Sequence, residues 1–227
     1  MKLSIIVPVF NEENTINEIV RQVENASLSI SKEIIVVDDD SLDETREKLE
    51  KLKKEINFIL IKHQRNQGKG AAIRTGISKA TGDFILIQDA DLEYNPQEYS
   101  ILLEPLLKGE AEVVYGSRNL GKNKRGSWSF FWGGKLLTFL ANLLYGLSIT
   151  DEATCYKVFR TDLLKSLDLR CRGFEFCPEV TAKVAKKGIK IHEVPISYNP
   201  RSRKEGKKIK WKDGIKATWI LIKLKFK

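Results

Sequence analysis

The sequence is short of cysteine and histidine. Its 227 residues include three cysteines, Cys155, Cys171 and Cys177, and two histidines, His63 and His192. No two cysteines form a C-x-x-C pair, which disfavours both a zinc ribbon and a disulfide scaffold. No serine or cysteine has a base partner nearby, so nucleophilic triad chemistry is also disfavoured.

Long apolar runs are missing as well. No segment approaches the roughly 18–20 apolar residues that cross a bilayer. The apolar run at 3–10 is too short for the core of a signal peptide and is interrupted at Pro8. We therefore expect a cytoplasmic protein without a membrane-spanning segment.

Acidic residues are scarce at the C-terminus. The formal net charge is +9, from 39 basic and 30 acidic side chains. Residues 1–200 are balanced, with 28 of each, whereas residues 201–227 carry eleven basic side chains and only Glu205 and Asp213 as acids. Such a basic block attracts polyanions: phosphate groups, an anionic membrane surface or nucleic acid.

Apolar runs alternate with helical patterns over residues 1–120. Strands are expected at 3–9, 33–37, 57–62, 83–87 and 112–115. Capping boxes at Thr15-x-x-Glu18 and Ser41-x-x-Glu44 predict two helix starts, and two further helices are expected around residues 73–77 and 97–107. This alternation predicts βαβ crossovers and an α/β fold with a mostly parallel sheet, whose ligands bind beyond the carboxyl ends of the strands.

Two later segments carry many large apolar side chains. Residues 126–150 predict one unusually apolar helix, which either packs in the core or meets lipid or a greasy substrate. A helix at 178–187 and a strand at 189–196 follow. Residues 211–226 predict an amphipathic, basic helix with tryptophans, typical of an interfacial membrane helix and equally of a helix that packs on the core.

Acidic side chains follow two of the predicted strands. Asp89 and Asp91 stand two residues apart after the fourth strand, where both carboxylates can reach one divalent cation, which would neutralise a departing diphosphate. A solvated acidic loop is the alternative. One of Asp38, Asp39 and Asp40 can accept hydrogen bonds from a nucleobase or ribose, and the alternative is stabilisation of a helix N-terminus.

The segment Gly68-Lys69-Gly70 looks like part of a phosphate-binding loop. It matches neither the P-loop pattern nor the dinucleotide pattern, because Ile73 occupies the position of the third glycine. We therefore disfavour both of those nucleotide-binding folds.

Five segments in order resemble family 2 glycosyltransferases, which are inverting enzymes of the GT-A type. They are LSIIVPVFNEE (3–13), IVVDDDSLD (35–43), NQGKG (66–70), QDADLE (88–93) with Pro96, and GSR (116–118). Later segments are similar to the dolichol-phosphate mannose synthase branch: Thr150-Asp151, CYKVFR (155–160), FEF (174–176) with Glu179, and EVPISY (193–198) with Arg201.

The resemblance implies a role for each matching residue. The donor nucleotide would contact Pro8, Phe10, Glu12, Asp39, Lys69 and Ala90. Mg²⁺ or Mn²⁺ would be held by Asp89, Asp91 and Glu93, with Arg118 on the donor phosphates. The acceptor phosphate would meet Lys135, while Arg201 and Arg203 would belong to a basic segment that closes over the phosphates.

The resemblance also implies an organisation and an activity. Residues 1–200 would form a Rossmann-like GT-A domain, with a nucleotide-sugar half (1–120) and an acceptor half (121–200), followed by a basic amphipathic segment (201–227). The enzyme would transfer a hexose, with glucose and mannose donors both open, to a polyprenyl phosphate. It would act as a peripheral protein on the inner, anionic face of the membrane, held there by its C-terminal helix.

Two other functions compete with this one. Transfer to a glycan or protein hydroxyl would require a carboxylate base, for which Glu179 is the candidate. A phosphate acceptor is already an anion near pH 7 and needs none. A non-catalytic nucleic-acid binder is the remote alternative, disfavoured because the acidic strand ends would repel the nucleic-acid backbone.

Overall fold

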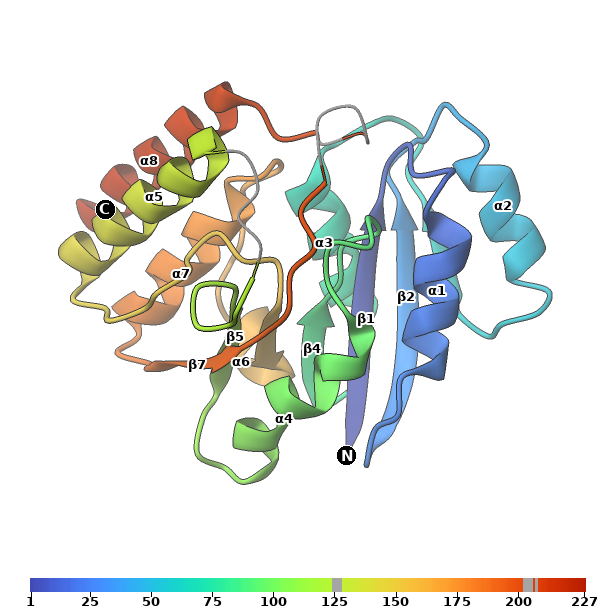
Figure 1. The fold of residues 1–227 in the computed structure, drawn as a ribbon, viewed down its shortest axis with the longest axis horizontal. Coiled ribbons are helices and arrows are strands. Elements are labelled where there is room, and N and C mark those ends of the chain that lie inside the picture. The colour runs from blue at the N-terminus through green and yellow to red at the C-terminus, as the bar shows by residue number, and fades with distance from the viewer. Residues whose placement is uncertain (124–127, 202–205, 207) are drawn as a thin grey trace.

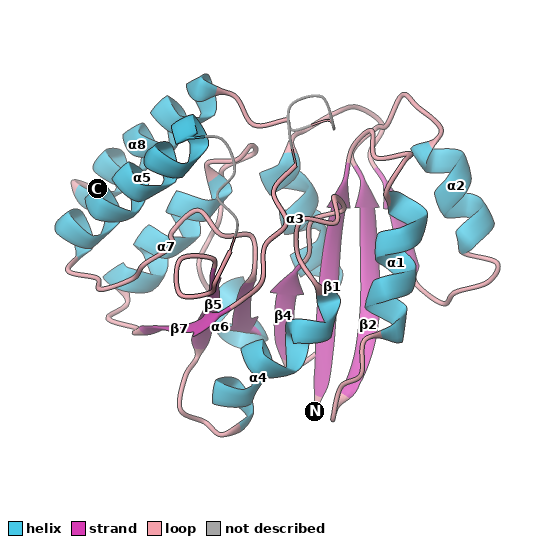
Figure 2. Cartoon of the chain, viewed as in Figure 1, coloured by secondary structure: helices cyan, strands magenta, loops and turns pink. Residues whose placement is uncertain are grey.

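The protein was analysed as a computed structural model that describes residues 1–123, 128–201, 206 and 208–227 (Figures 1 and 2). One predicted site residue, Arg203, lies outside these ranges. Among the helices of the described residues, none has both the length and the hydropathy to cross a bilayer.

A seven-stranded sheet forms the centre of the molecule. Its strands are β1 (Lys2–Val9), β2 (Ser31–Asp38), β3 (Ile59–Lys62), β4 (Phe84–Ile87), β5 (Val113–Ser117), β6 (Lys157–Arg160) and β7 (Ile191–Pro195). Their spatial order is β3-β2-β1-β4-β6-β5-β7. Only β6 runs antiparallel to its neighbours β4 and β5; the other paired strands are parallel. The expected α/β fold with a mixed, mostly parallel sheet is confirmed.

Helices cover both faces of the sheet. They are α1 (Ile16–Asn25), α2 (Thr45–Leu52), α3 (Lys69–Lys79), the 3-10 helix η1 (Pro96–Glu98), α4 (Tyr99–Leu107), α5 (Trp128–Tyr145), α6 (Thr161–Lys165), α7 (Phe176–Lys186) and α8 (Trp211–Lys225). Helix α3 packs on β1 and β2 and contacts α6, while α4 packs on β5 to β7. The apolar run of β1 is buried throughout from Leu3 to Val9, as a strand between two helical layers requires.

The alignment of the strands brings their carboxyl ends to one edge of the sheet. Val9 at the end of β1 pairs with Asp38 at the end of β2, and Ile6 pairs with Ile87 at the end of β4. This edge is at the top of Figure 1, where the loops after β1, β2 and β4 meet. The sequence predicted that ligand-binding side chains gather there.

Helices α5, α7 and α8 form a separate group at the left of Figure 1. Ala141, Ala182 and Leu221 make a small apolar cluster between them. The Tyr145 hydroxyl donates to the carbonyl of Leu221 at 2.7 Å, which ties α5 to α8. The predicted division of the chain at residue 200 stays a prediction.

The helix start predicted at Thr15 is confirmed, but neither predicted capping box forms. Thr15 makes no cap hydrogen bond; its hydroxyl donates to the carbonyl of Ala90 at 2.7 Å instead. Helix α2 starts after Glu44, and the Ser41 hydroxyl accepts the N–H of Asn11 at 3.0 Å. In both places a loop from another part of the chain has taken the hydroxyl that the local pattern assigned to a helix end.

Of the two alternatives for residues 126–150, packing in the core holds for only one side of α5. Thr138 and Ala141 are buried, but Trp132, Phe139 and Leu143 are each more than half exposed. Helix α8 has the same two-sided character, with Ala217 and Leu221 buried and Trp219 exposed. Each helix therefore packs on the domain with a narrow inner side and presents large apolar residues to solvent.

Candidate functional site

Four carboxylates gather where β1 and β4 end. Glu12 follows β1, while Asp89, Asp91 and Glu93 follow β4; we call these four residues the acidic cluster. All four side chains are largely buried, Glu12 at 9% and Glu93 at 8% exposure. Because β1 and β4 are adjacent parallel strands, their following loops are placed side by side.

Basic side chains contact three members of the acidic cluster. The Lys69 ammonium lies 2.5 Å from Asp89 Oδ1. The Arg201 guanidinium lies 3.0 Å from both Glu12 and Asp91, and Lys208 reaches Glu12 at 2.6 Å. Lys69 begins α3, whereas the other two come from the segment between β7 and α8. Charges from three distant parts of the chain therefore meet at this edge.

The two neighbouring aspartates differ in their electrostatics. Burial, followed by repulsion from Asp89 and Glu93, raises the pKa of Asp91 to about 7. Burial also acts to raise the pKa of Asp89, but Lys69, together with Cys155 and Arg201, outweighs burial and the pKa is lowered. Additional positive charge beside Asp91 would therefore be stabilised by the carboxylates of the cluster.

Asp89 and Asp91 fit a divalent cation better than the predicted trio does. Their oxygens are the hard ligands that Mg²⁺ and Mn²⁺ prefer. Glu93 is engaged elsewhere: it accepts the Tyr198 hydroxyl at 2.9 Å and the N–H of Arg201 at 2.7 Å. Within the described ranges no three acidic, histidine or cysteine side chains converge on one metal position, so the structure does not bring Glu93 into a ligand set with the aspartates.

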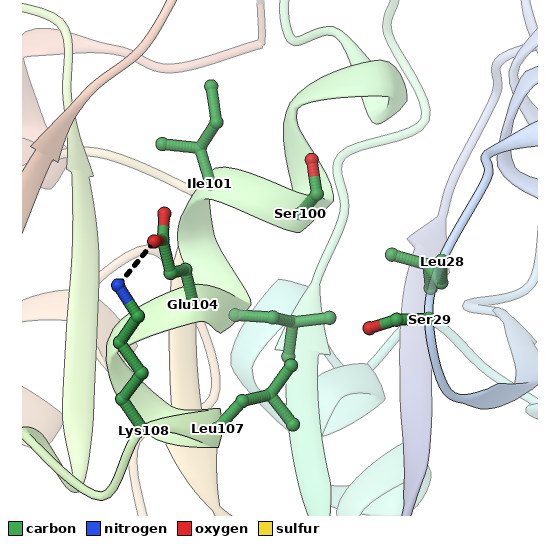
Figure 3. Close-up of a pocket in the computed structure, with 8 residues that line it drawn as sticks. Leu28, Ser29, Ser100, Ile101, Glu104, Leu107 and Lys108 are labelled. Carbon is green, nitrogen blue, oxygen red and sulfur yellow. Dashed lines mark hydrogen bonds and ion pairs between the residues drawn. The ribbon is translucent and has the colours of Figure 1, made fainter.

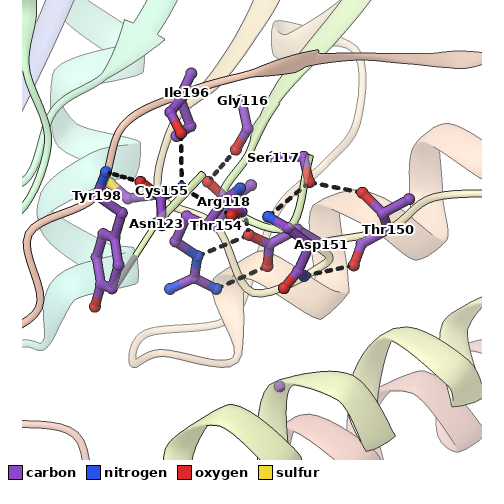
Figure 4. Close-up of polar contacts among 12 residues, drawn as sticks. Gly116, Ser117, Arg118, Asn123, Thr150, Asp151, Thr154, Cys155, Ile196 and Tyr198 are labelled. Atoms are coloured by element: carbon purple, nitrogen blue, oxygen red, sulfur yellow. Dashed lines mark hydrogen bonds and ion pairs between the residues drawn. The ribbon is translucent and has the colours of Figure 1, made fainter. Parts of the chain in front are cut away.

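Arg118 is fixed at the end of β5 by a buried partner. Its guanidinium makes two hydrogen bonds of 2.7 Å to Asp151, and its N–H adds a third at 3.0 Å (Figure 4). Burial acts to raise the pKa of Asp151, but Arg118 outweighs it and keeps the pKa low. The Tyr198 ring lies 5.0 Å from the guanidinium carbon. The pair holds a positive charge in a fixed orientation at the sheet edge.

Asp39 organises the loop that leads to Lys69. Its carboxylate accepts the N–H groups of Gln67 at 2.9 Å and Gly68 at 2.7 Å, and it lies 2.7 Å from His63 Nδ1. These contacts come from within the chain, so Asp39 shapes the predicted nucleoside pocket by holding the 63–68 loop. The contact of Asp39 with the donor stays a prediction.

The two glycines of the 68–70 segment allow a close approach of two backbones. Gly68 has φ +96°, and a Cβ there would lie 2.5 Å from the carbonyl oxygen of Arg172. A Cβ on Gly70 would lie 2.7 Å from the carbonyl oxygen of Cys171. The glycines therefore serve the packing of α3 against residues 171–173.

Glu179 lies beneath this contact and holds it in place. Its carboxylate accepts the N–H groups of Arg170 at 2.9 Å and Cys171 at 2.7 Å, and Lys183 at 2.8 Å. Burial acts to raise its pKa, but these hydrogen bonds outweigh burial and the pKa is lowered. This geometry supports a positioning role for Glu179.

The remaining predicted site residues are Pro8, Phe10, Ala90 and Lys135. Pro8 is buried in β1, and the Phe10 ring lies 5.9 Å from the Lys208 ammonium. Ala90 is buried between the two aspartates. Lys135 lies on α5 with its ammonium 5.9 Å from the Phe131 ring, and the described contacts do not join it to the cluster.

Sequence reasoning did not assign four residues that the structure places at or beside the site: His63, Asp151, Tyr198 and Lys208. Asp151 and Tyr198 stand in the segments that resembled the mannose synthase branch, so a signal existed for them. His63 and Lys208 had no recognisable motif.

A surface pocket lies far from this edge. It is lined by Leu28 and Ser29 before β2, by Ser100 and Glu104 of α4, and by Lys108 just after α4 (Figure 3). Glu104 and Lys108 are paired with each other at 2.6 Å. Helix α4 lies at the bottom of Figure 1, away from the carboxyl ends of the strands, so this pocket is separate from the acidic cluster.

Comparison with known sequences gives one family. The sequence profile described as "Glycosyl transferase family 2" matches residues 4–168. A dolichol-phosphate mannosyltransferase from Pyrococcus furiosus is 30% identical over 213 residues, covering 91% of this chain and 59% of the relative. The hexosyltransferase Agl6 of low-salt glycan biosynthesis from Haloferax volcanii is 32% identical, covering 88% of this chain and 48% of the relative. The chain thus spans about half the length of these two relatives.

Two further comparisons cover nearly all of this chain. A UDP-N-acetylglucosamine–dolichyl-phosphate N-acetylglucosaminyltransferase from Methanococcus voltae is 30% identical, covering 97% of this chain and 95% of the relative. Among solved structures, glucosyl-3-phosphoglycerate synthase from Mycobacterium tuberculosis, in complex with Mn²⁺, UDP and phosphoglyceric acid, superposes with a TM-score of 0.74 at 18% identity, covering 98% of this chain and 76% of that one. This likeness confirms the expected GT-A fold.

Proposed function

Since this chain belongs to glycosyl transferase family 2, we propose that it transfers a hexose from a nucleoside diphosphate sugar to a polyprenyl phosphate. The observation that carries the proposal is the acidic cluster at the carboxyl edge of the sheet, with Lys69 and Arg201 in contact with it. Relatives whose names specify dolichyl phosphate as acceptor support the choice of acceptor.

Both the acidic and the basic side chains at this edge would take part in binding the donor. Asp89 and Asp91 would hold Mg²⁺ or Mn²⁺, which would neutralise charge on the leaving diphosphate. Lys69 and Arg118 are fixed by Asp89 and Asp151 and would attract the donor phosphates. The loop held by Asp39 would support the nucleoside.

The acceptor chemistry requires alignment more than proton transfer. A phosphate oxygen of the acceptor bonds to the anomeric carbon while the bond from that carbon to the diphosphate breaks, giving a lipid-linked hexose and a nucleoside diphosphate. With a second pKa near 6, a phosphate monoester is largely a dianion at pH 7, so no base is needed. Transfer to a hydroxyl would need a base, and the three donors bound to Glu179 disfavour the candidate for that role.

The proposed location is the inner face of an anionic membrane, reached through α8. Lys212, Lys216, Lys223 and Lys225 of α8 lie among exposed apolar residues. Each lysine close to an anionic surface contributes about 1 kcal/mol of attraction.

The test is a transfer assay with two acceptor classes. Purified protein is incubated with glucose or mannose donors, Mn²⁺ and either a polyprenyl phosphate or a sugar hydroxyl acceptor, and labelled hexose is measured in each product. We expect lipid-linked hexose, lost on chelation of the metal. Labelling of the hydroxyl acceptor alone would contradict the acceptor class.

Two variants test the site within the same assay. Asp89→Asn and Asp91→Asn should each lower turnover by about 100-fold or more, since charge stabilisation at the leaving group is lost. Asp162→Asn is the matched control, because that side chain is 69% exposed and pairs only with a surface arginine, Arg160, among the ion pairs of the described residues. Full turnover by either cluster variant would contradict the proposed site.

A further inference from the structure

Helices α5 and α8 expose two apolar stripes with the same spacing. The members on α5 are Trp128, Trp132, Leu136, Phe139 and Leu143; those on and just after α8 are Trp211, Ile215, Trp219, Ile222 and Phe226. In both sets successive members are separated by four, four, three and four positions, which keeps them on one side of a helix. We call these ten residues the paired stripes.

The two stripes lie on one surface of the molecule. Helices α5 and α8 run side by side in the same direction, as Figure 1 shows. The Tyr145 hydroxyl bonds to the carbonyl of Leu221, and the Lys225 ammonium lies 5.6 Å from the Tyr145 ring, so the helices also meet at their C-terminal halves. Both pack inward on α7 through Ala141, Ala182 and Leu221, which leaves the paired stripes facing outward together.

Charge on these helices is almost entirely positive. Lys135 is the single charged residue in the α5 sequence, and α8 contains four lysines with Asp213 as its one acid. A face with large apolar residues and tryptophans, flanked by lysines, matches the boundary between headgroups and acyl chains of an anionic bilayer. A second copy of this chain is a poorer occupant, because it would bring its own lysines against these.

We propose that the paired stripes form one docking face for an anionic lipid surface, in which α5 contributes as much as α8. This deepens the proposed function, since it places the whole two-helix face, and not the C-terminal helix alone, on the membrane that would hold a polyprenyl acceptor. Binding itself requires neither nucleotide nor acceptor.

The docking face leads directly to the acidic cluster. Both helices begin at the end nearest the carboxyl edge of the sheet in Figure 1. Lys208 contacts Glu12 at 2.6 Å, and α8 begins three residues later at Trp211. Three residues of extended chain span at most about 11 Å. A bilayer on the docking face would therefore present lipid headgroups beside the site.

Vesicle flotation without nucleotide or acceptor tests the docking face. The probes are vesicles of neutral phosphatidylcholine alone and of phosphatidylcholine mixed with anionic phosphatidylglycerol. We expect the wild type to bind the anionic vesicles at least tenfold more tightly than the neutral ones. The variant Leu136→Ser/Phe139→Ser changes α5, Ile215→Ser/Trp219→Ser changes α8, and Leu42→Ser/Ile101→Ser removes exposed apolar residues elsewhere as a control.

Each stripe variant should lose at least tenfold in affinity, while the control stays within twofold of the wild type. Since all six side chains are exposed, circular dichroism should show the same fold in all three variants. An α5 variant that binds as the wild type does would overturn the shared face, and so would a wild type that binds no vesicles or forms a dimer that the α5 variant abolishes. Hexose transfer to a short, water-soluble prenyl phosphate should be unchanged in the α5 variant, so failed docking and failed catalysis are distinguishable.

Discussion

Three non-glycine residues at the carboxyl edge of the sheet adopt left-handed backbone conformations. They are Asn11 after β1, Asp40 after β2 and Leu92 after β4, with φ of 50°, 65° and 60°. Each follows or separates residues of the predicted site, and Leu92 lies between two carboxylates of the acidic cluster. Strain of this kind persists where the surrounding contacts fix the backbone. The tight turns therefore fix the backbone from which the acidic side chains project.

Asp40 allows this strain to be measured. Asp40→Gly and Asp40→Ala both remove the 3.4 Å contact with Arg46, and they differ only by a Cβ in the left-handed region. We expect the glycine variant to be more stable by about 1 kcal/mol in urea unfolding. At Glu44, where φ is −71°, alanine should be at least as stable as glycine. If alanine were at least as stable as glycine at Asp40 as well, strain at Asp40 would be contradicted.

Asp151 should stabilise the protein as well as the site. It is 2% exposed and accepts three hydrogen bonds from Arg118. Asp151→Asn should lower the free energy of unfolding by about 2 kcal/mol, because hydrogen bonds to a charged group are lost in a buried position. Chemical denaturation measures this loss, and donor affinity should fall as Arg118 loses its fixed orientation. A loss below about 0.5 kcal/mol would show that Arg118 finds another partner.

The residues of the site were predictable to the extent that topology alone places them. Acids after β1 and β4 had to meet, because the carboxyl ends of adjacent parallel strands share one edge. The residues that these acids contact come from distant parts of the chain, and no local sequence pattern predicts such contacts. The prediction that Asp39 touches the donor did not include the contacts of its carboxylate with His63 and the N–H of Gly68, 24 and 29 residues further along the chain.

At the scale of the elements, Glu33 connects the beginning of three strands. It is in β2, and its carboxylate accepts the Ser4 hydroxyl of β1 at 2.5 Å and the N–H of Thr81, before β4, at 2.7 Å. Lys2 adds an ion pair at 2.7 Å. Burial acts to raise the pKa of Glu33, but these partners outweigh it and lower the pKa to about 2.

This network predicts a pH-dependent part of the stability. A carboxyl whose pKa falls from 4.5 to about 2 on folding stabilises the native state above pH 4.5, and the contribution is lost as the pH falls towards 2. Glu33→Gln should therefore be less stable than the wild type at pH 7, and the gap should narrow between pH 5 and pH 3. Urea unfolding across this range is the measurement. A difference in unfolding free energy between the two proteins that does not change with pH would show that Glu33 stabilises the fold by its packing and not by its charge.

The contact between α3 and residues 171–173 predicts that a side chain at Gly70 strongly destabilises the protein. Gly70→Ala would place a Cβ 2.7 Å from the carbonyl oxygen of Cys171, so the start of α3 and Lys69 must move. We expect lower stability and weaker nucleotide binding, measured by thermal shift with and without a nucleoside diphosphate. Gly133→Ala is the control: its Cβ meets nothing within 4 Å on helix α5, so it should stabilise by about 1 kcal/mol.

One strand escaped prediction for a physical reason. Strand β6 is four residues long, and its first, Lys157, is fully buried. The Lys157 ammonium donates to the carbonyls of Glu152 and Thr154, each at 2.6 Å, and lies 4.2 Å from the Tyr115 ring. In a sequence, a lysine indicates a solvent-exposed position. Lys157 is instead buried, with its ammonium hydrogen-bonded to the preceding loop, so it interrupts the apolar pattern that revealed β1 and β4.

At the scale of the whole molecule, residues from the first and the last parts of the sequence meet at the acidic cluster. Arg201 and Glu12 are 189 residues apart in sequence, and Lys208 reaches both Glu12 and the carbonyl of Asn11. The net charge of +9 comes from the C-terminal segment, and Arg201 and Lys208 of this segment contact the acidic cluster before α8 begins. The charge asymmetry of the sequence thus has a structural function, since it brings positive charge to the site on the way to the proposed docking face.

This arrangement predicts that Arg201 and a divalent cation compensate for one another at the cluster. Arg201→Ala removes the guanidinium that lies 3.0 Å from both Glu12 and Asp91, and leaves their carboxylates with less positive charge nearby. We expect a lower melting temperature in the presence of a chelator and a larger rise on addition of Mn²⁺ than the wild type shows, because the ion binds the folded state more tightly when charge there is less neutralised. Arg170→Ala is the matched control, as Arg170 pairs with the exposed Asp168 on the surface. Equal rises in the wild type and Arg201→Ala would show that the metal position and the guanidinium are independent, and would separate the C-terminal segment from the chemistry of the site.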